Sequence, residues 1–237
     1  MKKVMWIVSI FSVIMTAIAV QFMPDSVPMH YNMAGEIDRW GSKYENFIFA
    51  AIIIVFSLVW SLLIAYYEKK ASKSSEEKVC VEALSNAKVI KVTGVSMAVM
   101  FTVLQGYCLY KDCKIANADV TVAQMNISKL TCILIGLLFI VLGNFIPKVK
   151  NNMVIGIRTK WSMYNDVTWM KSNRFGGVTL MITGVLVIMT SVFVKEHIAI
   201  ICMLIYTFVD TLITVFFSYK VYKCEVKSAP MVEEMNK

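Results

Sequence analysis

The stretch of sequence that decides the fold is FIFAAIIIVFSLVWSLLIAY, residues Phe47–Tyr66. It carries no charge and matches the run of about 20 apolar residues that a helix needs to cross a bilayer. Hydrophobic residues make up 58% of the chain, and the mean hydropathy is +0.65. Similar segments are Val4–Phe22, Val92–Tyr110, Leu130–Ile146, Val178–Val194 and Ile198–Phe217. We therefore predict an all-α integral membrane protein with six transmembrane helices, since the alternation typical of barrel strands is missing.

The positions of lysine and arginine predict the orientation, because cytoplasmic loops retain these residues. With both termini on the cytoplasmic side, 17 basic residues lie inside and 5 outside, and Lys91 and Lys129 stand at span entrances. The net charge of +8 follows from this arrangement, and no concentrated basic face indicates direct nucleic-acid binding. The first span, with Lys2 and Lys3 before it, also has features of a cleaved signal peptide, but its apolar run is long and favours an anchor.

We expect four regions along the chain. They are an N-terminal helical hairpin with a structured outer loop (1–66), a cytoplasmic linker with the third helix and an outer loop (67–126), a core of helices four to six (127–219), and a cytoplasmic tail (220–237). The tail is polar without an apolar period, which predicts irregular structure. The six cysteines lack metal-site spacing, and a disulfide between Cys108 and Cys113 is left open as an alternative to free thiols.

The connection between the first two spans, Pro24–Glu45, has the composition of a structured loop. Its prolines hold the chain extended, and its glycines allow turns. Four acids against two bases give it a net charge of −2. One interpretation is a docking face for a basic peptide or a cation; the other is that the acids and His30 hold the loop together with Arg39 and Lys43. The candidate ligand-binding residues are Asp25, His30, Asn32, Glu36, Asp38 and Trp40.

Neither catalysis nor metal binding is indicated. The only histidines are His30 and His197, so the HExxH pattern of a membrane zinc protease is missing. No nucleophile with a neighbouring base is recognisable. We therefore predict no metal, no cofactor and no enzymatic activity.

The connection Pro147–Gly177 alternates basic residues with Val, Ile and Trp, which predicts an interfacial inner loop between helices four and five. Arg158 is expected to meet lipid phosphates or a carboxylate. Asn165 has the character of a helix N-cap, and a short helix from there is expected to carry Trp169 into the membrane interface before Gly176-Gly177 re-aims the chain. The candidate inner-loop residues are Asn144, Gly156, Arg158, Thr159, Trp161, Trp169 and Arg174.

Asp210 is the one formal charge inside the six apolar segments. A carboxylate at mid-span costs about 2.5–3.5 kcal/mol on insertion scales, so we expect it to face the bundle interior. Gln105 and threonines near Asp210 in the sixth span are the candidate partners. The carboxyl group either joins helices by hydrogen bonds or serves proton relay or cation binding.

Two motifs occur in order along the chain. The outer one runs through Pro24–Asn32 and continues from Gly35 to Lys43. The inner one combines Gly143-Asn144, Gly156-Ile157-Arg158-Thr159, Trp161-Ser162, Trp169 and Arg174-Phe175-Gly176-Gly177. Together they resemble the SdpI family of bacterial toxin-immunity membrane proteins. Two departures stand out, because Lys160 occupies a position where Pro is expected and Ser172-Asn173 replace a Thr-His pair.

The resemblance implies a multi-pass protein of the bacterial plasma membrane that binds or neutralises a secreted, membrane-active toxic peptide. For some members it also implies signalling, in which toxin leads to recruitment of a transcriptional repressor. The expected partners are membrane lipids, the toxic peptide and, for a signalling member, a cytoplasmic repressor. The alternative from the residues alone is a small proton-coupled transporter or channel that uses Asp210 within inverted three-span halves.

Overall fold

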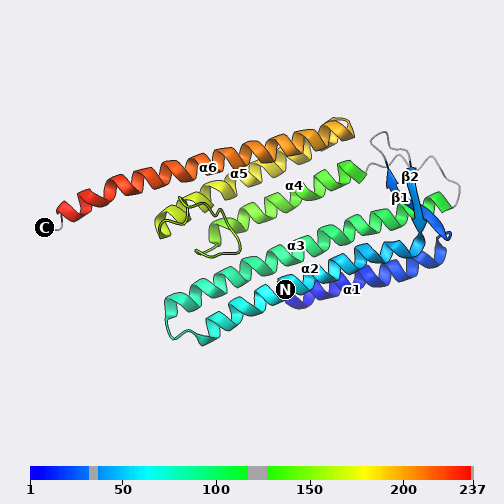
Figure 1. Cartoon of the computed structure of the whole chain (residues 1–237), viewed down its shortest axis with the longest axis horizontal. Helices are drawn as coiled ribbons and strands as arrows, with labels where there is room; N and C mark the ends of the chain where they lie inside the picture. Colours follow the sequence, from blue (N-terminus) through cyan, green and yellow to red (C-terminus); the bar gives the residue numbers. More distant parts are fainter. Residues whose placement is uncertain (32–36, 117–126, 236–237) are drawn as a thin grey trace. The chain divides into compact units, whose positions relative to one another are not determined.

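The structure is a computed structural model that describes residues 1–31, 37–116 and 127–235. Its long helices are α1 (Lys2–Ala19), α2 (Asn46–Lys73), α3 (Glu77–Ala116), α4 (Ile127–Phe145), α5 (Asp166–Phe193) and α6 (Glu196–Met235) (Figure 1). Short 3₁₀ turns are η1 (Val20–Phe22), η2 (Lys43–Glu45) and η4 (Ile146–Lys148). Among the described residues, six helices are long and apolar enough to cross a membrane, which confirms the predicted all-α, six-span class.

Several helices extend beyond their predicted apolar spans. The cytoplasmic linker expected before the third helix is itself helical over residues 68–88, except for the connection 74–76 between α2 and α3. Helix α6 continues to Met235, so the prediction of an irregular tail is wrong over most of its length. Hydropathy marks only the part of a helix that suits lipid, whereas Lys- and Glu-rich sequence continues a helix in water at little cost.

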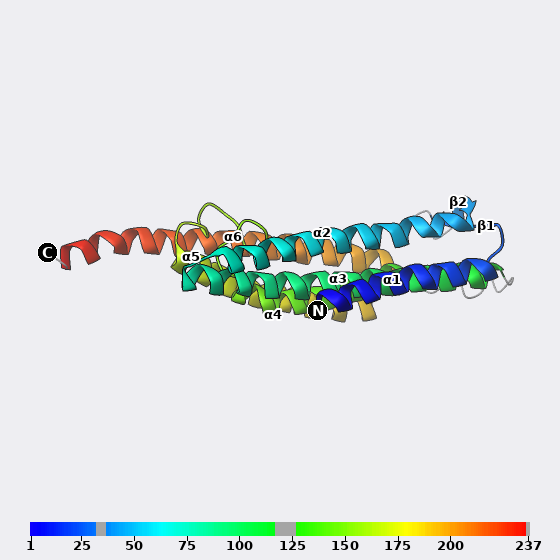
Figure 2. The ribbon, with the colours of Figure 1, turned by 90° about the horizontal axis from the view of Figure 1, so that it is seen from below.

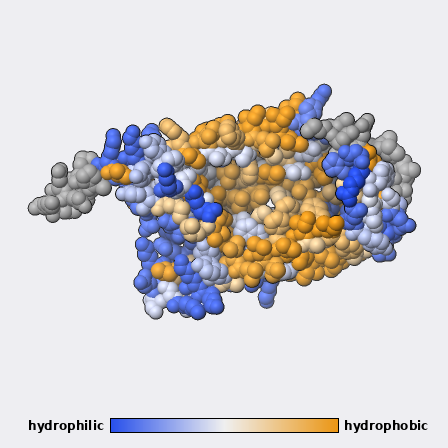
Figure 3. Space-filling model, viewed as in Figure 1, coloured by the Kyte–Doolittle hydropathy of each residue, from blue (hydrophilic) through white to orange (hydrophobic). Residues whose placement is uncertain are grey.

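Contacts divide the chain into two compact units, residues 1–62 with 94–131 and residues 63–93 with 132–237. Helices α2 and α3 each contribute one part to either unit. Along the helices, apolar residues gather in the middle and polar residues at the ends (Figure 3). The four regions expected from the sequence stay a prediction.

In the first unit, α1 lies beside α2 and α3 (Figure 1, Figure 2). Its polar stripe is the side of the helix that is buried. Ser9, Ser12 and Thr16 are fully buried, whereas Ile7 and Phe11 on the other side of the helix are 66% and 56% exposed. This distribution is the reverse of that in a water-soluble protein. It fits a helix whose outward face is solvated by lipid.

Hydrogen bonds tie α1 to α2 and α3. They join Trp6 Nε1 to Ser61 Oγ (2.8 Å), Ser9 Oγ to Ser57 Oγ (2.6 Å) and Ser12 Oγ to Gln105 Oε1 (2.6 Å). The Gln105 side chain also donates to the Thr16 hydroxyl. Gln105, considered from the sequence as a partner of Asp210, therefore has both ends of its amide engaged by α1.

In the second unit, α4 and α5 approach each other closely at glycines. A Cβ atom on Gly143 would lie 2.5 Å from the carbonyl oxygen of Gly177, and one on Gly184 would lie 2.5 Å from that of Gly136. On each helix the two glycines are two turns apart and therefore share a face. Small residues of this kind let backbones come together in lipid, where packing drives helix association.

Candidate functional site

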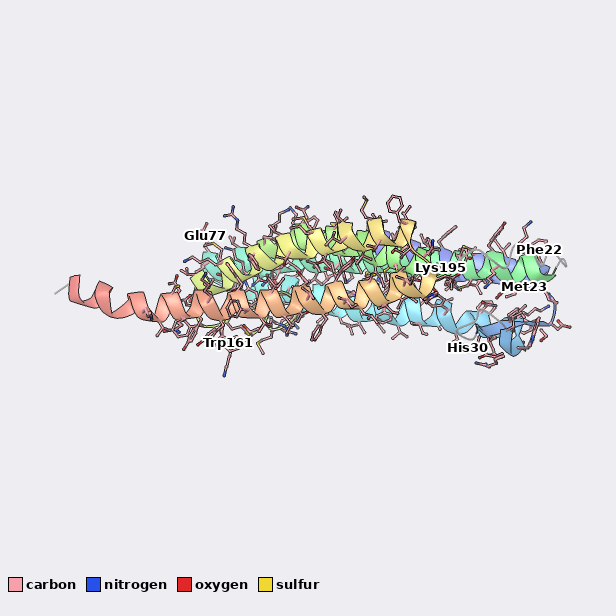
Figure 4. All side chains as sticks on the ribbon, turned by 90° about the horizontal axis from the view of Figure 1, so that it is seen from above. Phe22, Met23, His30, Glu77, Trp161 and Lys195 are labelled. Atoms are coloured by element: carbon pink, nitrogen blue, oxygen red, sulfur yellow. The ribbon has the colours of Figure 1, made fainter. Side chains whose placement is uncertain are left out.

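The structured loop expected between α1 and α2 is a β-hairpin. Strand β1 (Ser26–Tyr31) pairs antiparallel with β2 (Ile37–Ser42), and the register is irregular around His30. Pro28 is tolerated because it lies next to this irregularity in a sheet that has only edge strands. Figure 4 places His30 at the same end of the first unit as Phe22 and Met23.

An apolar cluster anchors the hairpin to the helix ends. Its buried members are Val20, Met23, Val27 and Leu109. Val27 has no exposed surface, so it fixes β1 against the end of η1 and against α3. The hairpin is therefore held to the helices, and its polar side chains are presented from a fixed base.

The end of α3 beside the hairpin carries a buried acid that the sequence reasoning missed. Asp112 is 6% exposed and accepts a hydrogen bond from Asn46 Nδ2 (3.1 Å). The apolar run ends at Tyr110, so Asp112 reads as part of a solvated connection, although α3 continues past it. Cys108 and Cys113 in the same helix are free thiols, so the disulfide left open by the sequence is not formed.

Most charges of the hairpin are paired within it. His30 Nδ1 lies 2.6 Å from Asp38 Oδ1, and Lys43 Nζ lies 3.0 Å from Asp25 Oδ1. Arg39 pairs with Glu45, which also completes a capping box with Ser42 at the start of η2. These contacts support the interpretation that the acids and His30 hold the loop together. Of the candidate residues here, Asn32 and Glu36 lie outside the described residues.

The inner connection is a compact loop built around Trp169. Trp169 is 2% exposed, packs against Val89 and Val149, and donates from Nε1 to the Val149 carbonyl oxygen (2.8 Å). The prediction that Trp169 lies in the membrane interface is therefore wrong, because the loop covers its ring. The predicted short helix is also wrong in length, since α5 runs straight through Gly176-Gly177, and Gly177 faces α4.

Asn152 fixes the first half of this loop. Its Oδ1 accepts from the Ile155 backbone N–H (2.9 Å), and its Nδ2 donates to the Lys150 carbonyl oxygen (2.7 Å). The Tyr67 hydroxyl of α2 donates to the same Oδ1 (3.3 Å), and Asn86 Oδ1 of α3 accepts from the Lys150 N–H (2.9 Å). The loop is thus bonded to the ends of α2 and α3 that belong to its own unit.

Gly156 and Asn173 fix the second half. Gly156 has a φ of +113°, a conformation that L side chains rarely adopt, and a Cβ there would lie 2.6 Å from Asn173 Oδ1. Asn173 is fully buried; its Oδ1 accepts from the Ile157 N–H (2.8 Å), and its Nδ2 donates to the Trp169 carbonyl oxygen (3.0 Å). Asn173, one of the residues that depart from the expected family pattern, therefore ties the loop to α5.

The segment that follows Gly156 is also internally bonded. Arg158 is exposed, and its guanidinium donates to the Met153 carbonyl oxygen. Thr159 and Ser162 close a turn through the Thr159 N–H and the Ser162 hydroxyl (2.9 Å). Asn165 caps α5 with a capping box, which confirms the predicted N-cap.

The other inner-loop candidates do not meet at one point. Trp161 packs edge-on against Tyr219 of α6, with ring centroids 5.2 Å apart, and Figure 4 shows it beside that helix. Arg174 in α5 and Asn144 in α4 are both exposed. The loop therefore has a bonded centre and a separate exposed set of polar side chains.

Asp210 in α6 faces α5. The hydroxyl groups of Thr179 and Thr183 interact with its carboxyl group, and Asp210 Oδ1 is buried with no hydrogen-bond partner in the described part of the chain. Thr179 also lies 3.3 Å, oxygen to oxygen, from Thr214 of α6. Polar contacts of this kind join two helices in lipid, while a transport role for Asp210 stays a prediction.

Six membrane-crossing helices, a hairpin on one connection and a bonded loop on another define a multi-pass membrane protein. Residues 148–219 match the SdpI/YfhL protein family, and residues 7–55 match a domain of unknown function, DUF1648. The chain is 23% identical over 217 residues to the immunity protein SdpI of Bacillus subtilis (strain 168), which covers 92% of this chain and 93% of that protein. These matches support a likeness to the SdpI-type immunity proteins, carried by the last part of the chain in the family match and by most of its length in the relative. No solved structure matches it.

Proposed function

We propose that this chain is an immunity protein of the plasma membrane that binds and neutralises a secreted, membrane-active toxic peptide. The observation that carries the proposal is the similarity to the immunity protein SdpI along 92% of the chain. The activity is binding, without a catalytic step. In a signalling member, the inner loop would then recruit a transcriptional repressor.

The outer hairpin is the proposed contact surface for the peptide. The Asp25 side chain is 99% exposed even though it pairs with Lys43, and Trp40 and Tyr44 are 53% and 62% exposed. Exposed aromatic rings beside acids suit an amphipathic, basic peptide, since such rings bind both apolar groups and cations. Because the hairpin is anchored by a buried cluster, it offers this surface without first having to fold.

The proposal places both termini in the cytoplasm and the hairpin outside, as the distribution of basic residues predicts. In a variant whose native cysteines are replaced by alanine, Lys195→Cys should react with a membrane-impermeant maleimide on intact cells, whereas Ser75→Cys should not. Both residues are exposed and lie in short connections between helices. Permeabilised cells should label both positions; labelling of Ser75→Cys alone in intact cells would reverse the orientation.

Protection against the peptide tests the function. A sensitive bacterium that expresses this chain should keep its membrane potential during challenge with an Sdp-type toxic peptide, and the same strain without it should not. Asp25→Asn should lower the protective titre by about two- to fivefold, the effect of a charge pair worth up to about 1 kcal/mol. An equal collapse of the potential with and without the protein would reject the proposal for this peptide.

Two control variants distinguish the role of the outer hairpin from that of the cytoplasmic side of the protein. Glu76→Gln removes an exposed acid from the connection between α2 and α3 and should leave protection unchanged. Arg158→Ala should also retain protection but lose repressor-dependent signalling, because Arg158 is assigned to the inner face. Loss of protection in Glu76→Gln equal to that in Asp25→Asn would mean that general charge, and not the hairpin, is responsible.

A further inference from the structure

A pocket of about 500 Å³ lies between the end of α2 and the inner loop, within the second unit. It is lined from α2 by Leu63, Tyr66, Tyr67 and Lys70, and from the loop by residues Asn151, Asn152, Met153 and Val154. None of these residues is among the candidate site residues from the sequence. The pocket is also separate from the hairpin proposed to meet the toxic peptide.

The pocket has a rigid back wall. Tyr67 is 4% exposed and Asn152 is 9% exposed, and they are joined by the hydrogen bond from the Tyr67 hydroxyl to Asn152 Oδ1. Since the Asn152 amide also holds the loop backbone, neither side chain is free to turn towards a ligand. They shape the pocket, and any ligand must be recognised by the other side chains.

Three lining side chains are available to a ligand. Lys70 and Asn151 are exposed, and Tyr66 is 60% exposed. Within the described part of the chain, none of the three takes part in a hydrogen bond or ion pair. A primary ammonium, a phenol and a carboxamide together provide several donors, and no carboxylate lines the pocket. A pocket that offers hydrogen-bond donors and a positive charge, without a carboxylate, favours an anionic ligand.

A second positive charge, that of Arg158, is bonded to one of the residues that line the pocket. Arg158 donates to the carbonyl oxygen of Met153, which lines the pocket, and its guanidinium is close enough to Tyr67 to act on it electrostatically. Lys70 and Arg158 come from different elements, so one cation lines the pocket and a second is bonded to its loop wall. A phosphate group, with its several oxygens, matches this arrangement.

The order of residues along α2 indicates what carries the phosphate. Leu63, Tyr66 and Lys70 recur at helical spacing and follow one another from apolar to aromatic to cationic over about 10 Å of helix. The acyl chain, the glycerol backbone and the phosphate of a lipid have the same order. Tyr66 stands where the apolar run of α2 ends, the usual place for interfacial aromatic rings.

We propose that this pocket binds the phosphate-bearing headgroup of an acidic phospholipid, with Lys70 as the principal contact and Asn151 and Tyr66 as hydrogen-bond donors. Leu63 and Val154 would contact the start of the acyl chain. The site does not depend on toxin binding. It would tie the inner loop to the membrane surface through one defined lipid.

Native mass spectrometry of the full chain, released from neutral detergent, tests the proposal. The protein is titrated with phosphatidylglycerol and, separately, with phosphatidylcholine of the same acyl chains. One phosphatidylglycerol should bind preferentially, and Lys70→Gln should weaken it about fivefold, as expected for one juxtamembrane base. Lys69→Gln is the matched control, since it removes the same charge from the next residue, which does not line the pocket; it should change binding less than twofold.

The outcomes separate the possible ligands. Restoration of binding by Lys70→Arg supports a charge contact in the pocket. Equal losses in Lys70→Gln and Lys69→Gln would overturn the site in favour of a diffuse basic surface. Equal binding of both lipids would overturn headgroup recognition, and displacement of the lipid by an equimolar amount of inorganic phosphate would show that the site takes free phosphate. Displacement by an acidic peptide at that concentration would assign the pocket to a protein partner.

Discussion

Gly143→Ala is expected to destabilise the α4–α5 pair by about 2 kcal/mol, within the usual range for overpacking. The new Cβ would lie 2.5 Å from the Gly177 carbonyl oxygen and 2.9 Å from the Met181 backbone nitrogen. Both are backbone atoms of a continuous helix, so they yield only if α5 moves away from α4. Thermal unfolding in detergent should show a midpoint lower by about 4–8 °C.

The control for this substitution is Gly106→Ala in α3. A Cβ there would lie 3.4 Å from the Met15 sulfur atom, which ends a flexible side chain, and both helices stay in place. Because alanine is the better helix former, Gly106→Ala should leave the midpoint unchanged or raise it. Gly184→Ala should repeat the effect of Gly143→Ala, since its Cβ would meet the Gly136 carbonyl oxygen at 2.5 Å. Equal midpoints for Gly143→Ala and Gly106→Ala would contradict the close crossing.

The helices could be predicted because the bilayer imposes a length on every apolar run. Phe47–Tyr66 alone requires a spanning helix, and the other five runs repeat it. The parts that lie in water gave weaker signals. The tail from Lys220 has no apolar period and yet continues α6, since helix propensity and not hydropathy governs a segment that leaves the membrane.

The composition of the two loops predicted that they are structured, but it did not predict which of their residues contact each other. The composition of the outer loop left two interpretations open, a docking face and internal ion pairs. The hairpin register places His30 opposite Arg39, and only the folded side chains show that the His30 ring lies beside Asp38. The contacts of Trp169 could not be predicted from composition either. A tryptophan among basic residues near a span suggests an interfacial anchor, but the loop carbonyl of Val149 accepts its N–H and buries it. Long-range hydrogen bonds of this kind leave no mark in local sequence.

Asn173→Ala is expected to loosen the inner loop and to cost about 2–3 kcal/mol, because it removes the acceptor of the Ile157 N–H and leaves that group without its partner. Trypsin cleavage at Arg158 and Lys160 in the detergent-solubilised protein should accelerate, since the loop must open to enter the protease. The cleavage rate of Asn173→Asp should fall between those of the unchanged protein and Asn173→Ala. The aspartate keeps an oxygen that can accept from the Ile157 N–H, but it loses the donor to the Trp169 carbonyl oxygen.

The neighbouring Ser172 supplies the matched control for Asn173→Ala. Both side chains are fully buried in α5, but the Ser172 hydroxyl has no hydrogen-bond partner in the described part of the chain. Ser172→Ala therefore removes a polar atom that gains nothing from burial, and it should leave cleavage and stability unchanged or slightly improved. Faster cleavage in Ser172→Ala to the same degree as in Asn173→Ala would mean that packing at this turn of α5, and not the Asn173 amide, holds the loop. Slow cleavage in both variants would show that Asn152 and Trp169 suffice to hold it, and the proposed dependence on Asn173 would be wrong.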